Sequence, residues 1–147
     1  MLASGSAETP ERIIFLQLKC DALQQLGRKA EAETAAREAV TIATKLQSAP
    51  EIGPTEKPGW LAQAYSRAGR IDEAVAAMRR YVDAASPSTQ VRVRWQREIT
   101  AAELYAYANR PRECVEVLTK LLHVPSGLTV PMLKVDPAWD NMREDAG

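Results

Sequence analysis

The chain has 147 residues, which is the length of about one domain, and folding at this size buries roughly 70% of the surface of the extended chain. Lysine and arginine together number 19, as do aspartate and glutamate, so no net charge draws the chain to nucleic acid or to an anionic membrane. We therefore expect a partner that is recognised at short range, with no role for nucleic acid or membrane.

The first helix pair is marked by local signals. Thr9 and Pro10 predict a helix start, because a threonine side chain caps free N–H groups and proline suits the first helical position. Gly27 is predicted to end this helix, since glycine adopts the left-handed conformation at little cost. A second helix follows over about 29–47, and small residues along one side allow close packing of another helix. These small residues are Ala32, Ala36, Ala39 and Ala43.

Two further helix pairs follow. The segment SAPEIGPTEKPG, residues 48–59, is rich in proline and glycine, so it is predicted to be a loop. Ser86, Pro87 and Ser88 separate the second pair from the third. Asn109 stands in for glycine at the third joint, because asparagine tolerates positive φ better than most residues. The helices predicted for these pairs cover about 57–68 and 72–84, then a long helix ending near 109 and a partner over about 112–123.

The pattern changes after residue 123. Thr129 and Asp136 are predicted to cap two short helices, and Pro137 suits the first position of the second one. Both helices are too short to form another full pair. Their apolar residues, which include Met132 and Trp139, are expected to cover the end of the third pair.

The three joints form an internal repeat. Gly27, Gly69 and Asn109 lie 42 and 40 positions apart, within DALQQLGRKAEAETAAREAV, LAQAYSRAGRIDEAVAAMRRYV and AELYAYANRPRECVEVLTKLL. These segments resemble the tetratricopeptide repeat, which has Leu-Gly-x-x-Tyr in its first helix and a small alanine, then a large apolar residue, in its second. The second pair shows the pattern through Leu61, Ala62, Tyr65, Gly69, Ala74, Met78 and Tyr81. Pro58 departs from the family's usual tryptophan, and Cys114 replaces its alanine of close approach in the third pair.

The resemblance implies an all-α fold. We expect one domain over residues 1–147, an α-solenoid of three tetratricopeptide-like hairpins over about 10–47, 55–85 and 88–123, with a two-helix cap over about 128–147. The ending VPMLKVDPAWDNMRED is also similar to the close of helical-repeat regions in bacterial signalling and regulatory proteins. This second resemblance implies that the chain is one part of such a regulator.

The resemblance further implies a protein-interaction module whose first helices line a groove. The stripe expected there has no lysine or arginine, which argues against a clamp for a peptide C-terminal carboxylate. It carries the carboxylates of Asp21, Glu56 and Glu103, so we expect a neutral or basic peptide or helix. Trp60 is expected either as the main anchor or packed under the loop at 48–57, and Gln17, Asp21 and Gln63 as groove contacts or ordinary solvated residues. The predicted groove residues are Gln17, Asp21, Gln24, Gln63 and Glu103 in the stripe, with Trp60, Arg67 and Tyr107 at one rim of the groove.

An alternative function is self-association. Short arrays expose apolar end faces, and Ile13, Ile14 and Phe15 lie at the open N-terminal end without an obvious cover. Homodimer formation through these three residues is the second hypothesis.

The residues with chemical reactivity do not predict an enzyme. Cys20 and Cys114 lie in amphipathic patterns without CxxC spacing, which predicts reduced core thiols and no metal site. His123 is the single histidine, and its position two and a half turns from Cys114 places the two on roughly opposite helix sides. No cofactor motif and no targeting signal occurs, and no apolar run approaches the ~20 residues of a membrane span, so we expect a cytoplasmic protein.

Overall fold

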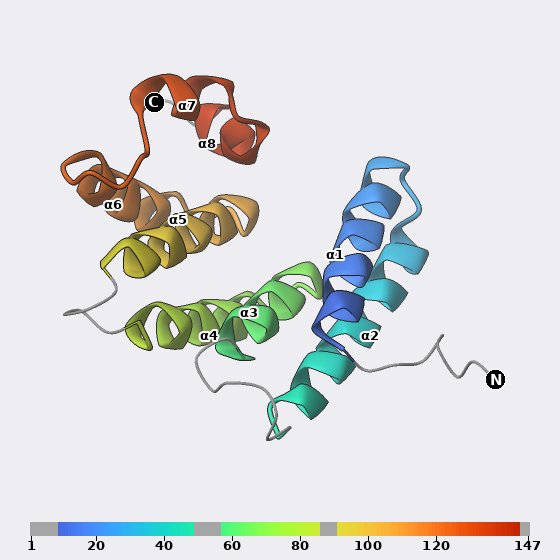
Figure 1. Cartoon of the computed structure of the whole chain (residues 1–147). Helices are drawn as coiled ribbons and strands as arrows, with labels where there is room; N and C mark the ends of the chain where they lie inside the picture. The colour runs from blue at the N-terminus through green and yellow to red at the C-terminus, as the bar shows by residue number, and fades with distance from the viewer. Residues whose placement is uncertain (1–8, 49–56, 86–90, 145–147) are drawn as a thin grey trace. The chain divides into compact units, whose positions relative to one another are not determined.

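The computed structural model describes residues 9–48, 57–85 and 91–144, and these residues contain helices and no strand (Figure 1). The predicted all-α fold of tetratricopeptide-like hairpins with a C-terminal cap is confirmed. The hairpins are formed by α1 (Pro10–Gln25) with α2 (Lys29–Leu46), α3 (Lys57–Arg67) with α4 (Ile71–Asp83), and α5 (Val91–Tyr107) with α6 (Pro111–Leu122). The cap consists of α7 (Val130–Val135), the 3₁₀ helix η2 (Pro137–Trp139) and α8 (Asp140–Glu144).

The chain divides into two compact units, Met1–Tyr81 and Val82–Gly147, so the division falls in the last turns of α4. The first unit contains the α1/α2 hairpin and α3, and the second contains the α5/α6 hairpin and the cap. The expectation of one domain over residues 1–147 stays a prediction.

The predicted caps are in place. The Thr9 hydroxyl accepts a hydrogen bond from the Arg12 N–H at 3.3 Å, and the Thr129 hydroxyl accepts one from the Met132 N–H at 3.4 Å. The Asp136 carboxylate accepts from the Ala138 N–H at 2.9 Å and starts η2 with Pro137 at its first position. Each cap satisfies an N–H group that the helix itself leaves without an acceptor.

The three joints share one backbone geometry. Gly27, Gly69 and Asn109 have φ values of 73°, 75° and 55°. In each case the N–H of the next residue, always an arginine, donates to the carbonyl five residues earlier, at 2.8–2.9 Å. The same arginine then pairs with a glutamate three residues on, at Arg28–Glu31, Arg70–Glu73 and Arg110–Glu113. The repeat read from the sequence is therefore a structural repeat at its joints.

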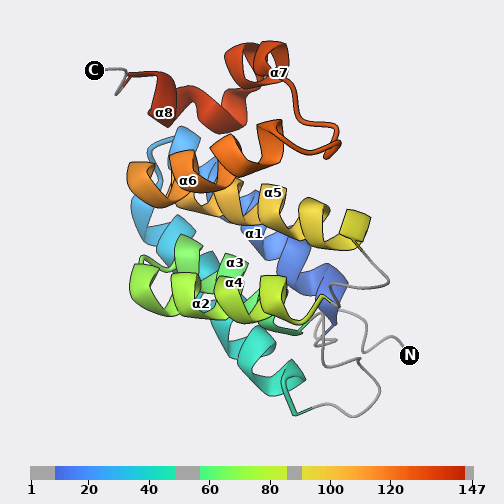
Figure 2. The ribbon, with the colours of Figure 1, turned by 90° about the vertical axis from the view of Figure 1, so that its left-hand side faces the viewer.

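The core of the first unit lies where α1, α2 and α3 meet (Figure 2). α1 contributes large residues such as Leu16, α2 contributes its alanine face, and α3 contributes Leu61 and Ala64. Gly59 in α3 lies against Tyr81 of α4, so that a Cβ atom at Gly59 would come within 3.0 Å of the ring. The helix predicted over about 57–68 is α3, and residues 57–59, which the predicted loop at 48–59 also included, form its first turn. Residues 49–56 lie outside the described part of the chain.

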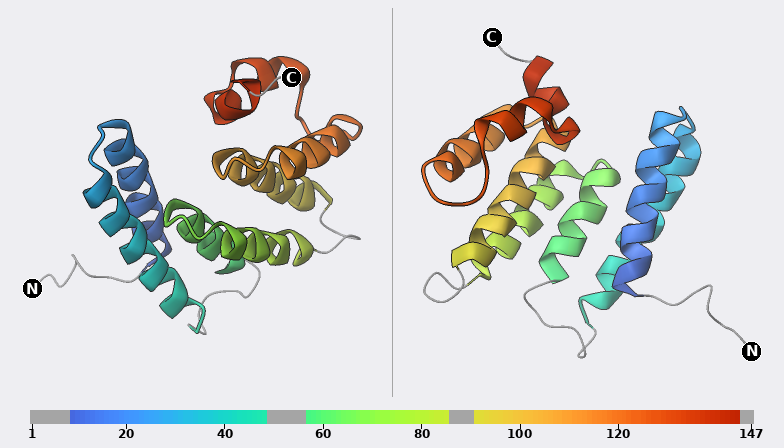
Figure 3. Two further views of the ribbon diagram at one scale, coloured as in Figure 1. Left: turned by 180° about the vertical axis from the view of Figure 1, so that it is seen from behind. Right: turned by 45° about the horizontal axis from the view of Figure 1, so that its top comes forward.

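In the second unit, α5 and α6 form a hairpin, and the cap lies against α5 (Figure 3). The Lys120 ammonium donates to the Glu98 carboxylate at 2.6 Å and links the two helices. Trp139 is the buried anchor of the cap, with 3% of its surface exposed. The Asn141 side-chain amide donates to the Ala106 carbonyl at 3.5 Å, and the Arg143 guanidinium donates to the Leu133 carbonyl at 2.9 Å. The Asn141 bond and the burial of Trp139 hold α8 and η2 on α5, and the Arg143 bond joins α8 to α7.

Candidate functional site

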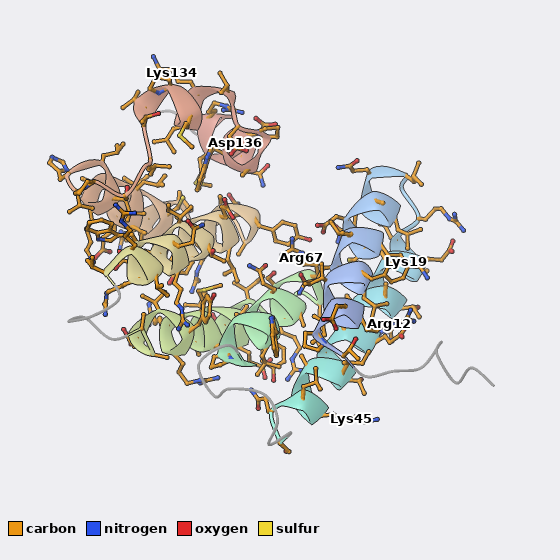
Figure 4. The ribbon with its side chains drawn as sticks, viewed as in Figure 1. Arg12, Lys19, Lys45, Arg67, Lys134 and Asp136 are labelled. Atoms are coloured by element: carbon orange, nitrogen blue, oxygen red, sulfur yellow. The ribbon has the colours of Figure 1, made fainter. Side chains whose placement is uncertain are left out.

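The predicted groove residues of the first unit lie on α1 and α3, and several of them bind one another. Arg67 extends from the last turn of α3 towards α1 (Figure 4). Its Nε and Nη2 atoms donate to the two Asp21 carboxylate oxygens at 3.3 Å and 3.1 Å. Its Nη1 atom donates to the Gln63 side-chain oxygen at 2.6 Å and to the Ser66 hydroxyl at 3.3 Å.

This network changes the expected charge of the stripe. Asp21 was expected to make the groove acidic, but its carboxylate is neutralised by Arg67 from the next hairpin. The Arg67 and Asp21 side chains are only 16% and 32% exposed, so the pair joins α1 to α3 as well as forming part of the surface. On α1, Gln17 is half-buried and Gln24 is exposed, which leaves amide groups as the main polar chemistry of the stripe.

Trp60 is half-buried and packs against the core formed by α1, α2 and α3. It therefore contributes to folding of the first unit, and only the remaining part of its surface is accessible to a partner. The loop that was the alternative cover for Trp60 falls largely at residues 49–56, outside the described residues.

The stripe on α5 opens into a pocket in the second unit. Gln96, Ile99 and Glu103 of α5 form one wall of a cavity of about 350 Å³. The other wall comes from the chain that follows α6 and from the cap. Its residues are Ser126, Gly127, Leu128, Met132, Asp136 and Trp139. Tyr107, the last predicted groove residue, is half-buried at the end of α5 and is not part of this wall.

Two carboxylates face this pocket. Glu103 reaches solvent, yet the pocket wall removes part of its hydration, and this burial raises its pKa; the nearby Asp136 carboxylate raises it further. Within the described residues, no basic side chain forms an ion pair with Glu103 or Asp136. Within the described part of the stripe, the negative charge that no cation neutralises therefore lies at this pocket, while Glu56 lies outside the described residues. Sequence reasoning found Glu103 but assigned Asp136 only as a helix cap, because its position beside Glu103 depends on the cap folding onto α5.

The chemically reactive side chains, those of Cys20, Cys114 and His123, lie in the core or on the surface of their own helix. Cys20 and Cys114 are free and buried, and burial raises the pKa of both thiols, that of Cys114 to about 11. A neutral buried thiol is a poor nucleophile. The exposed His123 ring lies 2.7 Å, through Nδ1, from the Thr119 carbonyl of its own helix. Among the described residues, no group of three or more His, Cys, Asp or Glu side chains is placed to hold a metal ion.

The self-association residues divide between core and surface. Ile13 was expected at an exposed end face, and this expectation is wrong, because Ile13 has 0% exposure and lies in the core with Leu16. Ile14 and Phe15 are 50% and 52% exposed. Leu18 and Leu26, which sequence reasoning missed, are more exposed still, at 65% and 70%. The sequence did carry a signal for them, because apolar residues occur on every side of α1. A helix that packs one side against the core cannot bury all of them.

Comparison with known protein families gives one match. Residues 59–87 match the model of the tetratricopeptide repeat, a segment that begins inside α3 and includes α4. Neither the comparison with curated proteins nor that with solved structures gives a match. No helix among the described residues is both long and apolar enough to cross a membrane. The match to residues 59–87 supports a tetratricopeptide repeat in this chain, and such repeats suggest a module for protein–protein interaction.

Proposed function

We propose that the chain binds a neutral or basic segment of a partner protein through the polar faces of α1 and α3 in the first unit and of α5 in the second. The observation that carries this proposal is the repeat at 59–87, within a fold whose three joints share one geometry. The polar groups at the surface of these helices support a neutral or basic partner segment. Gln17 offers an amide group that pairs with a peptide backbone, and Glu103 offers the negative charge. Gln24 lies exposed two turns after Gln17, and its Nε2 donates to the Cys20 sulfur at 3.7 Å.

Selection of random peptides displayed on phage tests the proposal. We expect peptides of neutral or positive net charge to be enriched on the immobilised chain. The Gln17→Ala/Gln24→Ala double variant is expected to weaken their binding at least fivefold. Thr34→Ala/Thr41→Ala is the matched control, because both threonines are exposed on α2 and bond only to carbonyls of their own helix. Enrichment of acidic peptides, or equal loss in both double variants, would count against the proposal.

A second candidate function, self-association, is favoured by the exposed apolar face of α1. Phe15, Leu18 and Leu26 are spaced so that they share one side of the helix, opposite the core residues Leu16 and Cys20. Analytical ultracentrifugation at two concentrations tests it. A native protein that is dimeric and a Leu18→Glu variant that is monomeric would support this function. A native protein that stays monomeric at about 200 µM would exclude it.

The C-terminal resemblance supports one further proposal about context. We propose that the chain works within a bacterial regulator in the cytoplasm, which suits its two free, buried cysteines. A kinase or winged-helix segment next to this chain in the complete reading frame would support this context. A secretion signal in that reading frame would contradict it.

A further inference from the structure

The pocket on α5 differs from the rest of the polar stripe in its charge, because neither of its two carboxylates forms an ion pair with another described residue. Its volume of about 350 Å³ lies at the small end of the range for ligand sites, roughly 300–1,000 Å³, which suits one long side chain rather than a larger molecule. All of its lining residues belong to the second unit, and each lies in the described part of the chain. The site is therefore complete within that unit.

The lining of the pocket combines apolar and acidic side chains. Ile99, Met132 and Trp139 provide carbon surface that matches an aliphatic stem. Glu103 and Asp136 provide two carboxylates, one from α5 and one from the cap. An aliphatic stem that ends in a positive charge satisfies both kinds of surface.

Among the side chains that the structure describes, none supplies this positive charge. Lys134 is exposed on α7 and forms no ion pair with either carboxylate, and Figure 4 shows it on the outer side of the cap. Arg143 is engaged by Asp140 and by the Leu133 carbonyl. The two carboxylates repel each other in partial isolation from water, which is a cost that a bound cation would remove.

We propose that this pocket binds an arginine side chain of the partner segment, with Glu103 and Asp136 accepting hydrogen bonds from its guanidinium group. Arginine fits better than lysine, because its planar fork donates N–H groups in fixed directions to two separate acceptors, whereas an ammonium acts as a point charge. The inference rests on the proposed function and names the side chain that the partner presents.

The test is a titration of ¹⁵N-labelled protein with N-acetyl-arginine methylamide, followed by amide chemical shifts. N-acetyl-citrulline methylamide is the matched ligand control, because citrulline keeps the shape of arginine and lacks its charge. We expect saturable shifts at Glu103, Leu128 and Asp136 with arginine, and binding at least fivefold weaker with citrulline. Equal binding of the two ligands, or shifts confined to other residues, would overturn the proposal.

Single variants test whether the carboxylates of Glu103 and Asp136 bind the guanidinium group. Glu103→Gln and Asp136→Asn each remove one charge while keeping the side-chain size, and Asn at 136 keeps an oxygen to accept from the Ala138 N–H. We expect each variant to weaken arginine binding at least threefold. Glu116→Gln, which removes the same charge from the exposed side of α6, is expected to leave binding unchanged. Equal effects of Glu116→Gln and Glu103→Gln would show a general charge effect and overturn the site.

The outcome separates this inference from the proposed function. Arginine amide binding at the pocket without any selected peptide would support the pocket and contradict the interaction module. Selection of peptides that lack arginine, together with no arginine amide binding, would support the module and contradict the pocket.

Discussion

The bond between Asp21 and Arg67 gives the sharpest test of how the predicted groove of the first unit is built. Arg67 could act as a free contact for a partner or as a brace between α1 and α3. The structure supports the second role, because the guanidinium donates to Asp21, Gln63 and Ser66. If Arg67 is a brace, then Asp21→Ala and Arg67→Met must each destabilise the chain, and the double variant must cost less than the sum of the two.

The expected coupling follows from exposure. Charge-assisted hydrogen bonds contribute about 1.5–3 kcal/mol when shielded, while exposed ion pairs contribute about 0.2–1 kcal/mol. Asp21 and Arg67 are 32% and 16% exposed, between these limits, so we expect a coupling free energy of about 1–2 kcal/mol. Arg67→Met also loses the bonds to Gln63 and Ser66, so its own cost should reach about 2–3 kcal/mol.

Urea unfolding followed by circular dichroism measures these free energies. A cost of 2 kcal/mol shifts the midpoint by about 1 M at the usual dependence on urea. The control is the same cycle on Arg28 and Glu31, which form a shorter bond, 2.6 Å, but are 55% and 54% exposed. We expect about 0.3–0.5 kcal/mol there. A coupling for Asp21 and Arg67 no larger than for the control would refute the brace.

Three further predictions follow from single positions. Gly59→Ala should destabilise the chain by about 1–3 kcal/mol in urea, because the new Cβ meets the Tyr81 ring at 3.0 Å, and an unchanged midpoint would contradict this packing. Asp136→Asn should raise the free energy of unfolding at pH 7 in the same urea assay. Burial raises the pKa of Glu103 and the nearby Asp136 carboxylate raises it further, and the variant removes this second cause. A raised pKa penalises the folded state only above the ordinary glutamate pKa, so the gain should vanish below about pH 4. Cys114, with a pKa of about 11, should react with a thiol reagent at pH 8 only on unfolding, and fast labelling of the native chain would contradict its burial.

Local signals account for what the sequence predicted well. The caps at Thr9, Thr129 and Asp136 and the joints at Gly27 and Asn109 depend on residues within one helical turn, and these predictions agree with the structure. The caps depend on a side-chain oxygen near the first N–H groups, and the joints depend on the ease of positive φ. Neither needs knowledge of distant parts of the chain.

Contacts between residues far apart in the chain account for what could not be predicted from the sequence. Arg67 and Asp21 are 46 positions apart, so their pairing becomes visible only once α3 packs on α1. The side of α1 that faces the core was equally hidden, because Ile13, Phe15 and Leu18 place apolar groups on several sides of one helix. The pocket required the cap to fold back onto α5 and bring Asp136 beside Glu103, which no local pattern specifies.

The central claim, that the chain binds a partner segment through the stripes of its first helices, is tested most directly by mapping a selected peptide onto the protein. Amide chemical shifts of the labelled chain are recorded as the peptide is added. We predict the largest changes in α1 and α3 around Gln17, Gln24 and Gln63, and in α5 around Glu103. Changes confined to the outer sides of α2 and α6 would contradict the claim.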